Sequence, residues 1–410
     1  MHTGSPPLAV TILSGFLGGG KTTLVNRILA EPHGRAIAVI VNDMSEINID
    51  AELIRRAPGG LTRTEETLVE MTNGCICCTL RDDLRTEVRR LAERGTFDYL
   101  VVESSGISEP LPVATAFDFD DPDHGRLSEV ARLDTMVTVV DATTVEAEFH
   151  GRETVADRGM AQGEDDVRPL CGLLTDQIEL ADVILLNKVT DAGPHRVAAA
   201  RRIIAALNPS ARLLEADHCT VPVEEIVDTR RFDFIRARQR PRWFAEMQGR
   251  GEHRPESETY GIGSFTYRAR RPFDLEKVRR VLLSPWPNVL RAKGHFWVAS
   301  QPDWAMGYSL AGSMVGIDPI GRWWAATARE KWPTHPGSLG VIHSHWARPY
   351  GDRRQELVFI GTGIDRAAIA AALDACLVGE AWRPSRAAGS GTGRRPAPAA
   401  GTAPAKRPGR

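Results

Sequence analysis

An α/β fold, built on a doubly wound and mostly parallel sheet, is predicted for residues 8–230. Short apolar runs rich in Val, Ile and Leu alternate there with longer segments of helical periodicity. Apolar runs without polar alternation are typical of strands buried on both faces of a parallel sheet, and strands that alternate with helices are typical of α/β proteins. Strands are predicted at 8–13, 36–41, 99–103, 135–140 and 183–187, and helices at 22–30, 80–93, 173–181 and 195–207.

A smaller α+β domain is predicted for residues 259–383. Strand-like runs and helical patterns are interspersed there, and eight of the nine tryptophans lie in it. The strands are expected at 265–268, 294–300 and 356–361, and the helices at 273–283 and 365–377.

Three segments are predicted to lie outside these regular elements. Residues 231–258 are rich in arginine, contain proline and then turn acidic, which is typical of a linker. Residues 384–410 are basic and rich in Ala, Gly and Pro, so this tail cannot bury enough apolar surface to fold and is expected to be disordered. Residues 144–170 include an acidic patch and are interpreted as a mobile surface loop.

The composition argues against several function classes. The 410 residues are 42% hydrophobic and 25% charged, as in soluble globular proteins of two or three domains. The formal net charge of −2 provides no general attraction to nucleic acid or to a membrane surface. No apolar run approaches the ~20 residues of a membrane span, and the N-terminus lacks a signal-peptide pattern. We therefore expect a cytoplasmic protein without membrane or nucleic-acid partners.

A glycine-rich loop carries the strongest chemical signal in the sequence. Residues 15–22 read Gly-Phe-Leu-Gly-Gly-Gly-Lys-Thr and match the P-loop pattern G-x-x-x-x-G-K-[ST]. A predicted strand precedes this loop and a predicted helix follows it, which is the context that a P-loop NTPase requires. Lys21 is expected to bridge the terminal phosphates, and the Thr22 hydroxyl is expected to bind Mg²⁺. The nucleotide-binding residues predicted here are Gly15, Gly18, Gly19, Gly20, Lys21, Thr22 and Thr23.

Two further segments follow predicted strands and complete a nucleotide site. Glu103 ends one strand, where a carboxylate can hold the Mg²⁺ shell or orient the attacking water, and the N–H of Gly106 can contact the γ-phosphate. Asn187 and Lys188 end a later strand, at the place where guanine-specific proteins bind the base. The position that usually carries the guanine-binding Asp is Thr190, followed by Asp191. Either Asp191 serves after a shift of one residue, or guanine selectivity is weakened.

Three cysteines lie within four residues and predict a metal site. Cys75, Cys77 and Cys78 precede a predicted helix, whose N-terminal dipole lowers thiol pKa values. Clustered thiolates suit Zn²⁺ above all, with Co²⁺, Fe²⁺ or Cu(I) as alternatives. Glu46 lies in an acidic turn after the second strand and is a candidate further ligand. Buried free cysteines are the alternative interpretation.

The other thiols and one pair of histidines give weaker evidence of function. Cys171 and Cys376 lie on apolar helical patterns and are expected in the core. Cys219 follows a strand-like run at 213–215 and is expected near the base pocket. His343 and His345 would share one side of a strand and so could bind a metal, but paired histidines are more often hydrogen-bonded or solvated.

Together these motifs resemble the CobW-type GTPases, which are metallochaperones related to the GTPases that mature urease and hydrogenase. The P-loop, the Cys-x-Cys-Cys motif, the Glu-Ser-Ser-Gly turn and the Asn-Lys pair carry the resemblance, and it extends over residues 8–383. It implies that hydrolysis of GTP, with Mg²⁺, drives the delivery of a transition metal to a client metalloprotein that docks on the C-terminal domain. A homodimer is also compatible with it.

Two branches of that family remain open, and so do two functions other than metal delivery. The turn at 42–46 and the long Trp-rich C-terminal domain resemble the branch associated with zinc limitation. They also resemble the activators of nitrile hydratase, which insert iron or cobalt. A nucleotide-dependent small-molecule kinase with structural cysteines is an alternative from another class. A regulatory switch without chaperone activity is a further one.

Overall fold

The protein folds into two compact units, Met1–Pro241 and Arg242–Arg410. The computed structural model describes residues 6–31, 34–42, 67–71, 79–117, 120–121, 125–161, 166–234 and 261–382. Most of the predicted linker and the whole predicted tail at 384–410 lie outside these ranges. The domain boundaries drawn from the sequence therefore stay a prediction.

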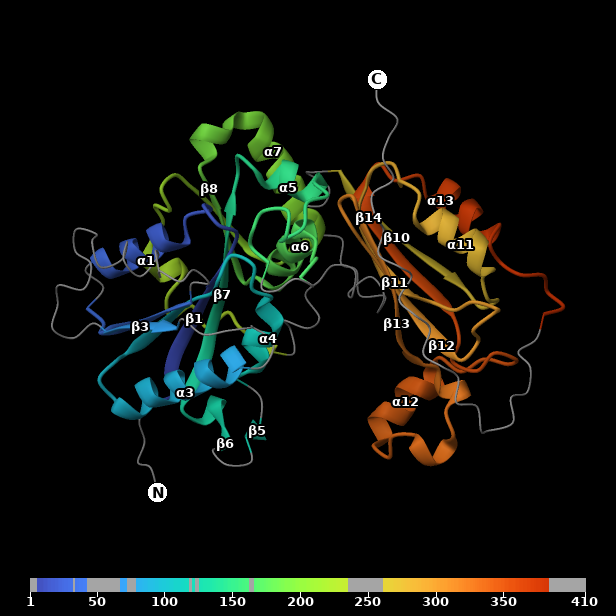
Figure 1. Cartoon of the computed structure of the whole chain (residues 1–410), viewed down its shortest axis with the longest axis horizontal. Helices are drawn as coiled ribbons and strands as arrows, with labels where there is room; N and C mark the ends of the chain where they lie inside the picture. Colours follow the sequence, from blue (N-terminus) through green and yellow to red (C-terminus); the bar gives the residue numbers. More distant parts are fainter. Residues whose placement is uncertain are drawn as a thin grey trace. The chain divides into compact units, whose positions relative to one another are not determined.

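A sheet of seven parallel strands forms the first unit and confirms the predicted fold class (Figure 1). Its strand order is β3-β2-β4-β1-β7-β8-β9. The strands are β1 (Leu8–Ser14), β2 (Ile37–Asn42), β3 (Thr67–Met71), β4 (Tyr99–Glu103), β7 (Ala131–Asp141), β8 (Val183–Asn187) and β9 (Arg212–Ala216). Four of them, β1, β4, β7 and β8, lie side by side, so their carboxyl ends meet at one edge of the sheet.

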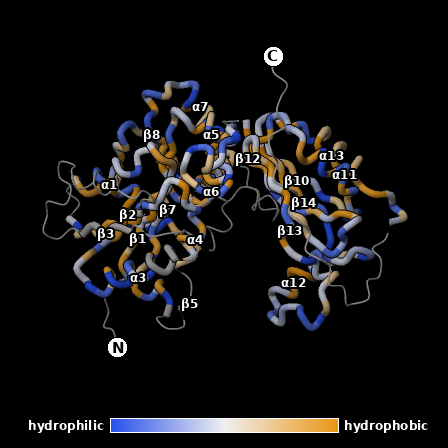
Figure 2. The backbone as a smooth tube through the Cα atoms, viewed as in Figure 1, coloured by the Kyte–Doolittle hydropathy of each residue, from blue (hydrophilic) through white to orange (hydrophobic). Residues whose placement is uncertain are grey.

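Helices cover both faces of this sheet, as a doubly wound fold requires. The apolar side of α1 packs on one face through Leu24, Val25 and Ile28, whereas α3 packs on the other through Leu84 and Val88. Figure 2 shows hydrophobic residues concentrated in these layers. The helices are α1 (Lys21–Ala30), α3 (Thr79–Arg94), α4 (Pro110–Thr115), α5 (Val145–His150), α6 (Leu170–Leu180) and α7 (Val189–Leu207), and a short pair, β5 (Asp120–Asp121) and β6 (Gly125–Arg126), lies apart from the main sheet.

Two predictions for this unit were wrong in part. The segment 144–170, predicted to be a surface loop, contains α5, because Val145 and Phe149 are spaced four residues apart and are both buried. The helix predicted from residue 195 begins at Val189, and a kink at Gly193 (φ 73°) before Pro194 separates its first turns from the rest. Glycine and proline obscured the first part of α7.

The second unit is a five-stranded antiparallel sheet with the order β10-β14-β11-β12-β13. Helices α11 and α13 cover one face, where Val278 and Leu373 join a core that includes Phe296 and Phe359. The elements are β10 (Ile262–Ala269), α11 (Leu275–Leu282), β11 (Val289–Phe296), β12 (Trp304–Ala311), β13 (Met314–Arg322), α12 (Pro336–Ser344), β14 (Gln355–Thr362) and α13 (Arg366–Asp374). This arrangement is the predicted α+β domain.

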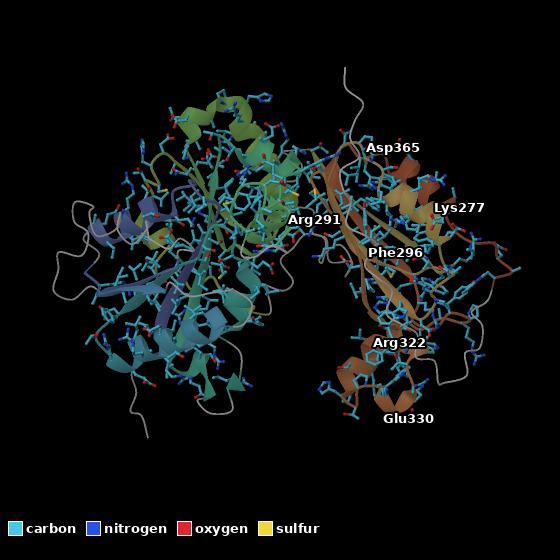
Figure 3. The ribbon with its side chains drawn as sticks, viewed as in Figure 1. Lys277, Arg291, Phe296, Arg322, Glu330 and Asp365 are labelled. Carbon is cyan, nitrogen blue, oxygen red and sulfur yellow. The ribbon has the colours of Figure 1, made fainter. Side chains whose placement is uncertain are left out.

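Both covering helices start at an aspartate that caps the free N–H groups of the first turn. The Asp365 carboxylate accepts a hydrogen bond from the N–H of Ala368 at 2.9 Å, and Asp274 does the same for Lys277 at 3.0 Å. Figure 3 labels Asp365 at the start of α13. The predicted strand at 294–300 was misplaced: it ends at Phe296, and β12 and β13 were not predicted.

None of the helices in the described part of the chain combines the length and the apolar character that crossing a membrane requires.

Candidate nucleotide site

The predicted phosphate loop connects β1, in the middle of the parallel sheet, with the start of α1. Crevices at the carboxyl ends of parallel strands are where α/β proteins bind ligands. Lys21 is only 5% exposed, and its ammonium group donates a hydrogen bond to the Phe16 carbonyl at 3.3 Å. The lysine therefore folds back over the loop. This is the position from which its charge reaches phosphates held by the loop N–H groups.

Gly20 lies where three segments meet, and only a glycine fits there. Its φ of 115° is strained for residues with a side chain. A Cβ atom at this position would lie 2.6 Å from Nδ2 of Asn187 and 2.8 Å from Sγ of Cys219. The loop is therefore packed directly against the ends of β8 and β9.

Asn187 ties these segments together. Its Nδ2 donates to the Gly19 carbonyl at 2.9 Å, and its Oδ1 accepts from the Cys219 N–H at 2.9 Å. The Cys219 thiol donates to the Gly20 carbonyl at 3.3 Å, and burial raises its pKa to about 11, so the thiol stays protonated at neutral pH. Cys219, which was expected near the base pocket, thus lies against Gly20 of the phosphate loop.

The magnesium side of the predicted site is also brought together. Glu103 is 1% exposed at the end of β4, and its Oε1 accepts a hydrogen bond from the Thr22 hydroxyl at 3.3 Å. A hydroxyl beside a carboxylate is the oxygen donor set that Mg²⁺ prefers. Gly106 packs on the same loop, because a Cβ there would lie 2.9 Å from the backbone nitrogen of Leu17.

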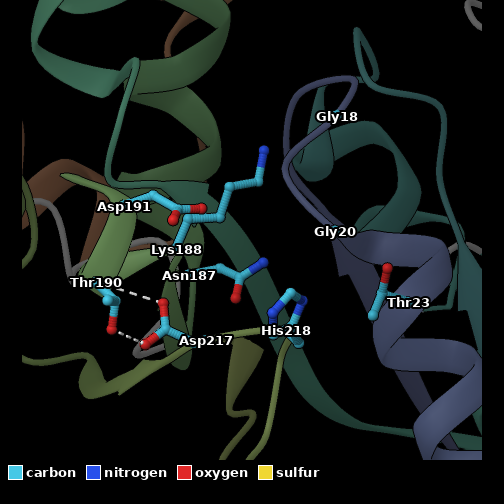
Figure 4. Close-up of a pocket in the computed structure, with 9 residues that line it drawn as sticks. All are labelled: Gly18, Gly20, Thr23, Asn187, Lys188, Thr190, Asp191, Asp217 and His218. Atoms are coloured by element: carbon cyan, nitrogen blue, oxygen red, sulfur yellow. Dashed lines mark hydrogen bonds between the residues drawn. The ribbon is translucent and has the colours of Figure 1, made fainter.

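A pocket of about 480 Å³ adjoins the loop on the side of β8 and β9 (Figure 4). Lys188 is the N-cap residue just before α7 and adopts the left-handed conformation (φ 62°), and its ammonium group forms an ion pair with Asp141 at the end of β7. The pocket is lined by Gly18, Gly20, Thr23, Asn187, Lys188, Thr190, Asp191, Asp217 and His218.

Three of the residues at this site, Asp141, Asp217 and His218, were missed by the sequence reasoning. Asp217 is held by Thr190, whose N–H donates to Oδ1 at 3.0 Å and whose hydroxyl donates to Oδ2. These hydrogen bonds lower the pKa of Asp217 and keep it ionised. The sequence signal for Asp217 and His218 was only that they are polar residues just after β9, and no motif marks them as binding residues.

The predicted metal ligands Cys75, Cys77, Cys78 and Glu46 all lie outside the described residues. Among the residues that are described, no group of three or more His, Cys, Asp and Glu side chains is arranged to hold a metal ion. Cys171 and Cys376 are buried, as expected.

The strand predicted to carry His343 and His345 was wrong. His343 lies on helix α12, which ends at Ser344, and His345 follows as its C-cap. His345 instead lines a pocket of about 280 Å³ in the second unit, together with His295 and Trp323. Burial lowers the pKa of His295 to about 4, so this imidazole is neutral at pH 7.

Comparison with known protein families decides where the chain belongs. Residues 9–215 match the CobW/HypB/UreG nucleotide-binding domain, and residues 262–377 match the cobalamin synthesis protein cobW C-terminal domain. The chain belongs to the CobW/HypB/UreG family of P-loop GTPases. The CobW-type resemblance drawn from the motifs is thereby confirmed.

Individual relatives in this family cover most of the chain. It is 45% identical over 389 residues to zinc-regulated GTPase metalloprotein activator 1 of Dictyostelium discoideum. The aligned region covers 92% of this chain and 81% of that protein. The chain is 29% identical over 381 residues to zinc chaperone YjiA of Escherichia coli, covering 89% of this chain and 98% of that one. The crystal structure of Zn(II)-bound YjiA GTPase is 23% identical, covers 91% of this chain and 99% of that one, and has a TM-score of 0.41.

Proposed function

We propose that this protein is a GTP-hydrolysing metallochaperone that binds zinc through Cys75, Cys77 and Cys78 and delivers it to a client metalloprotein. The convergence of Lys21, Glu103 and the Asn187 segment at one edge of the sheet is the observation that carries the proposal. It is supported by relatives whose names describe a zinc-regulated GTPase metalloprotein activator and a zinc chaperone.

The nucleotide would lie across the phosphate loop, with its terminal phosphates against Lys21 and its base toward the pocket beside Asn187. Thr22 and Glu103 would hold the Mg²⁺ ion, which neutralises charge on the phosphates. The buried carboxylate of Glu103 and the adjacent hydroxyl are 3.3 Å apart and fit such an ion chemically. Gly106 packs against Leu17 of the phosphate loop. A change at the γ-phosphate would therefore alter the conformation of the turn after β4.

Two described elements support a link between this nucleotide site and the zinc motif. Strand β3 ends at Met71 and helix α3 begins at Thr79, so residues 72–78 connect the carboxyl edge of the parallel sheet with a helix N-terminus. A helix N-terminus favours thiolate over thiol, and thiolate is the form that binds zinc. Glu46 follows β2, the neighbour of β3, and is a candidate further ligand.

In this proposal, GTP hydrolysis relaxes the segments that follow β2 and β4, and the metal passes to a client docked on the C-terminal domain. Zinc is the proposed cargo because both relatives cited above carry zinc in their names. Delivery of cobalt or iron to nitrile hydratase is the alternative within the family. We place the protein in the cytoplasm and regard a homodimer as compatible with the function.

Identifying the molecule that accepts the γ-phosphate distinguishes a GTPase from a small-molecule kinase. The full chain with Mg²⁺ and GTP is expected to release inorganic phosphate with water as the only acceptor, measured by a coupled phosphate assay. Added Zn²⁺ should change the turnover rate, because the cargo site is linked to the nucleotide. The proposal would be refuted if turnover began only after a small-molecule acceptor was added and if its rate did not change with Zn²⁺.

A further inference from the structure

The pocket beside Asn187 contains a carboxylate that the familiar guanine-binding pattern does not explain. Thr190 occupies the position where that pattern carries an aspartate. Its side chain points instead to Asp217, and both its hydroxyl and its N–H donate to the two oxygens of that carboxylate (Figure 4). A hydroxyl from the start of α7 and a carboxylate from the segment after β9 thus form a pair at the base side of the pocket.

The sheet places this carboxylate beside Asn187. Strands β8 and β9 are parallel neighbours, and Asn187 pairs with Ala216, the residue before Asp217. The loop after Asp217 is fixed as well, because the Cys219 N–H donates to Oδ1 of Asn187 at 2.9 Å. Asp217 is therefore one residue beyond the partner of Asn187, on a segment tied to the phosphate loop through Asn187 and Cys219.

We propose that Asp217 is the residue that recognises guanine in this protein, and that Thr190 positions it. This rests on the proposed function, which requires a bound guanine nucleotide. A carboxylate has acceptor sites beyond the two that Thr190 uses, and guanine presents two donors, N1–H and the 2-amino group. Adenine carries no N–H donor at ring positions 1 and 2, so its unprotonated N1 would face a negative oxygen, which disfavours ATP.

Asp191 is the competing candidate, since it lines the same pocket. It is exposed in the first turn of α7, and within the described residues no hydrogen bond fixes its carboxylate. Asp217 is half-buried and is held by two. A recognition group gains affinity when its geometry is set before the ligand arrives, which favours Asp217.

The test exploits xanthine, which carries a carbonyl where guanine carries its 2-amino group. In an Asp217→Asn variant, the amide oxygen still accepts from the ring N–H, and the amide NH₂ donates to that carbonyl. We expect the affinity for GDP to fall about tenfold or more and the affinity for XDP to rise by a similar factor, measured by calorimetric titration of the full chain with Mg²⁺. A gain of XDP binding cannot result from misfolding.

Asp191→Asn is the matched variant, with the same change one residue beyond Thr190, and it should keep the preference for GDP. A switch to XDP in Asp191→Asn, or a loss of GDP binding in Asp217→Asn without a gain for XDP, would overturn the inference. Wild-type protein that binds ADP as tightly as GDP would overturn it too, yet would leave zinc-linked hydrolysis intact. Absence of any nucleoside triphosphate hydrolysis would overturn the proposed function itself.

Discussion

Replacing Lys21 by alanine should lower the rate of GTP hydrolysis by at least about a hundredfold, the usual cost of removing one preorganised group that stabilises developing charge. Lys21 is buried against its own loop, and its hydrogen bond to the Phe16 carbonyl directs the ammonium group across the phosphate cradle. Its charge is needed most in the transition state, when charge on the γ-phosphoryl oxygens is redistributed. The measurement is steady-state phosphate release at saturating GTP.

The matched control is Lys277→Ala. Lys277 is an exposed lysine on α11 in the second unit (Figure 3), so its loss changes the net charge by the same amount without altering any residue that forms the nucleotide site. This variant should hydrolyse GTP at the wild-type rate. Circular dichroism and thermal unfolding would establish that Lys21→Ala remains folded. Hydrolysis by folded Lys21→Ala within threefold of wild type would contradict the assignment of the phosphate loop.

The second large effect is expected at the cysteine motif. The double substitution Cys77→Ala, Cys78→Ala should weaken zinc binding by at least about a hundredfold, because two of three proposed thiolate ligands are removed. Competition with a chromophoric zinc chelator measures this affinity. GDP affinity of the same variant should be unchanged, since the phosphate loop and the Asn187 segment keep all their described contacts.

Cys171 and Cys376 provide the control for this experiment. Both thiols are buried in the two cores, one in each unit, and a Cys171→Ala, Cys376→Ala variant removes the same number of thiols. Its zinc affinity should equal that of the wild type. If the Cys77, Cys78 variant retained wild-type zinc affinity, or if the core variant lost it, the thiolate cluster would not be the zinc site.

Much of the nucleotide site could be predicted because its residues lie in short local motifs. A P-loop needs only the residues 15–22 and their strand–helix context, and Glu103 and Asn187 each end an apolar run that predicts a buried strand. Asp217 could not be found in this way. Its role depends on the pairing of β8 with β9 and on a partner, Thr190, that lies 27 residues earlier in the chain.

The errors in the second unit have physical causes. Strand β13 contains Pro319 and is half exposed, as an edge strand permits, so it lacks the apolar run of a central strand. Helix α12 contains Gly337 and Gly340, which lower helix propensity, and it starts at a Pro that follows the capping residue His335. Ile342 is its one buried residue, so the helix has no apolar periodicity from which its local sequence could predict it.

The central claim is that the nucleotide state controls the metal. Zinc affinity of the full chain, measured by chelator competition with a non-hydrolysable GTP analogue and again with GDP, tests it most directly. We expect zinc to bind at least about tenfold more tightly with the GTP analogue, because hydrolysis is proposed to relax the segments after β2 and β4 and release the cargo. Equal zinc affinity in the two nucleotide states would contradict the account.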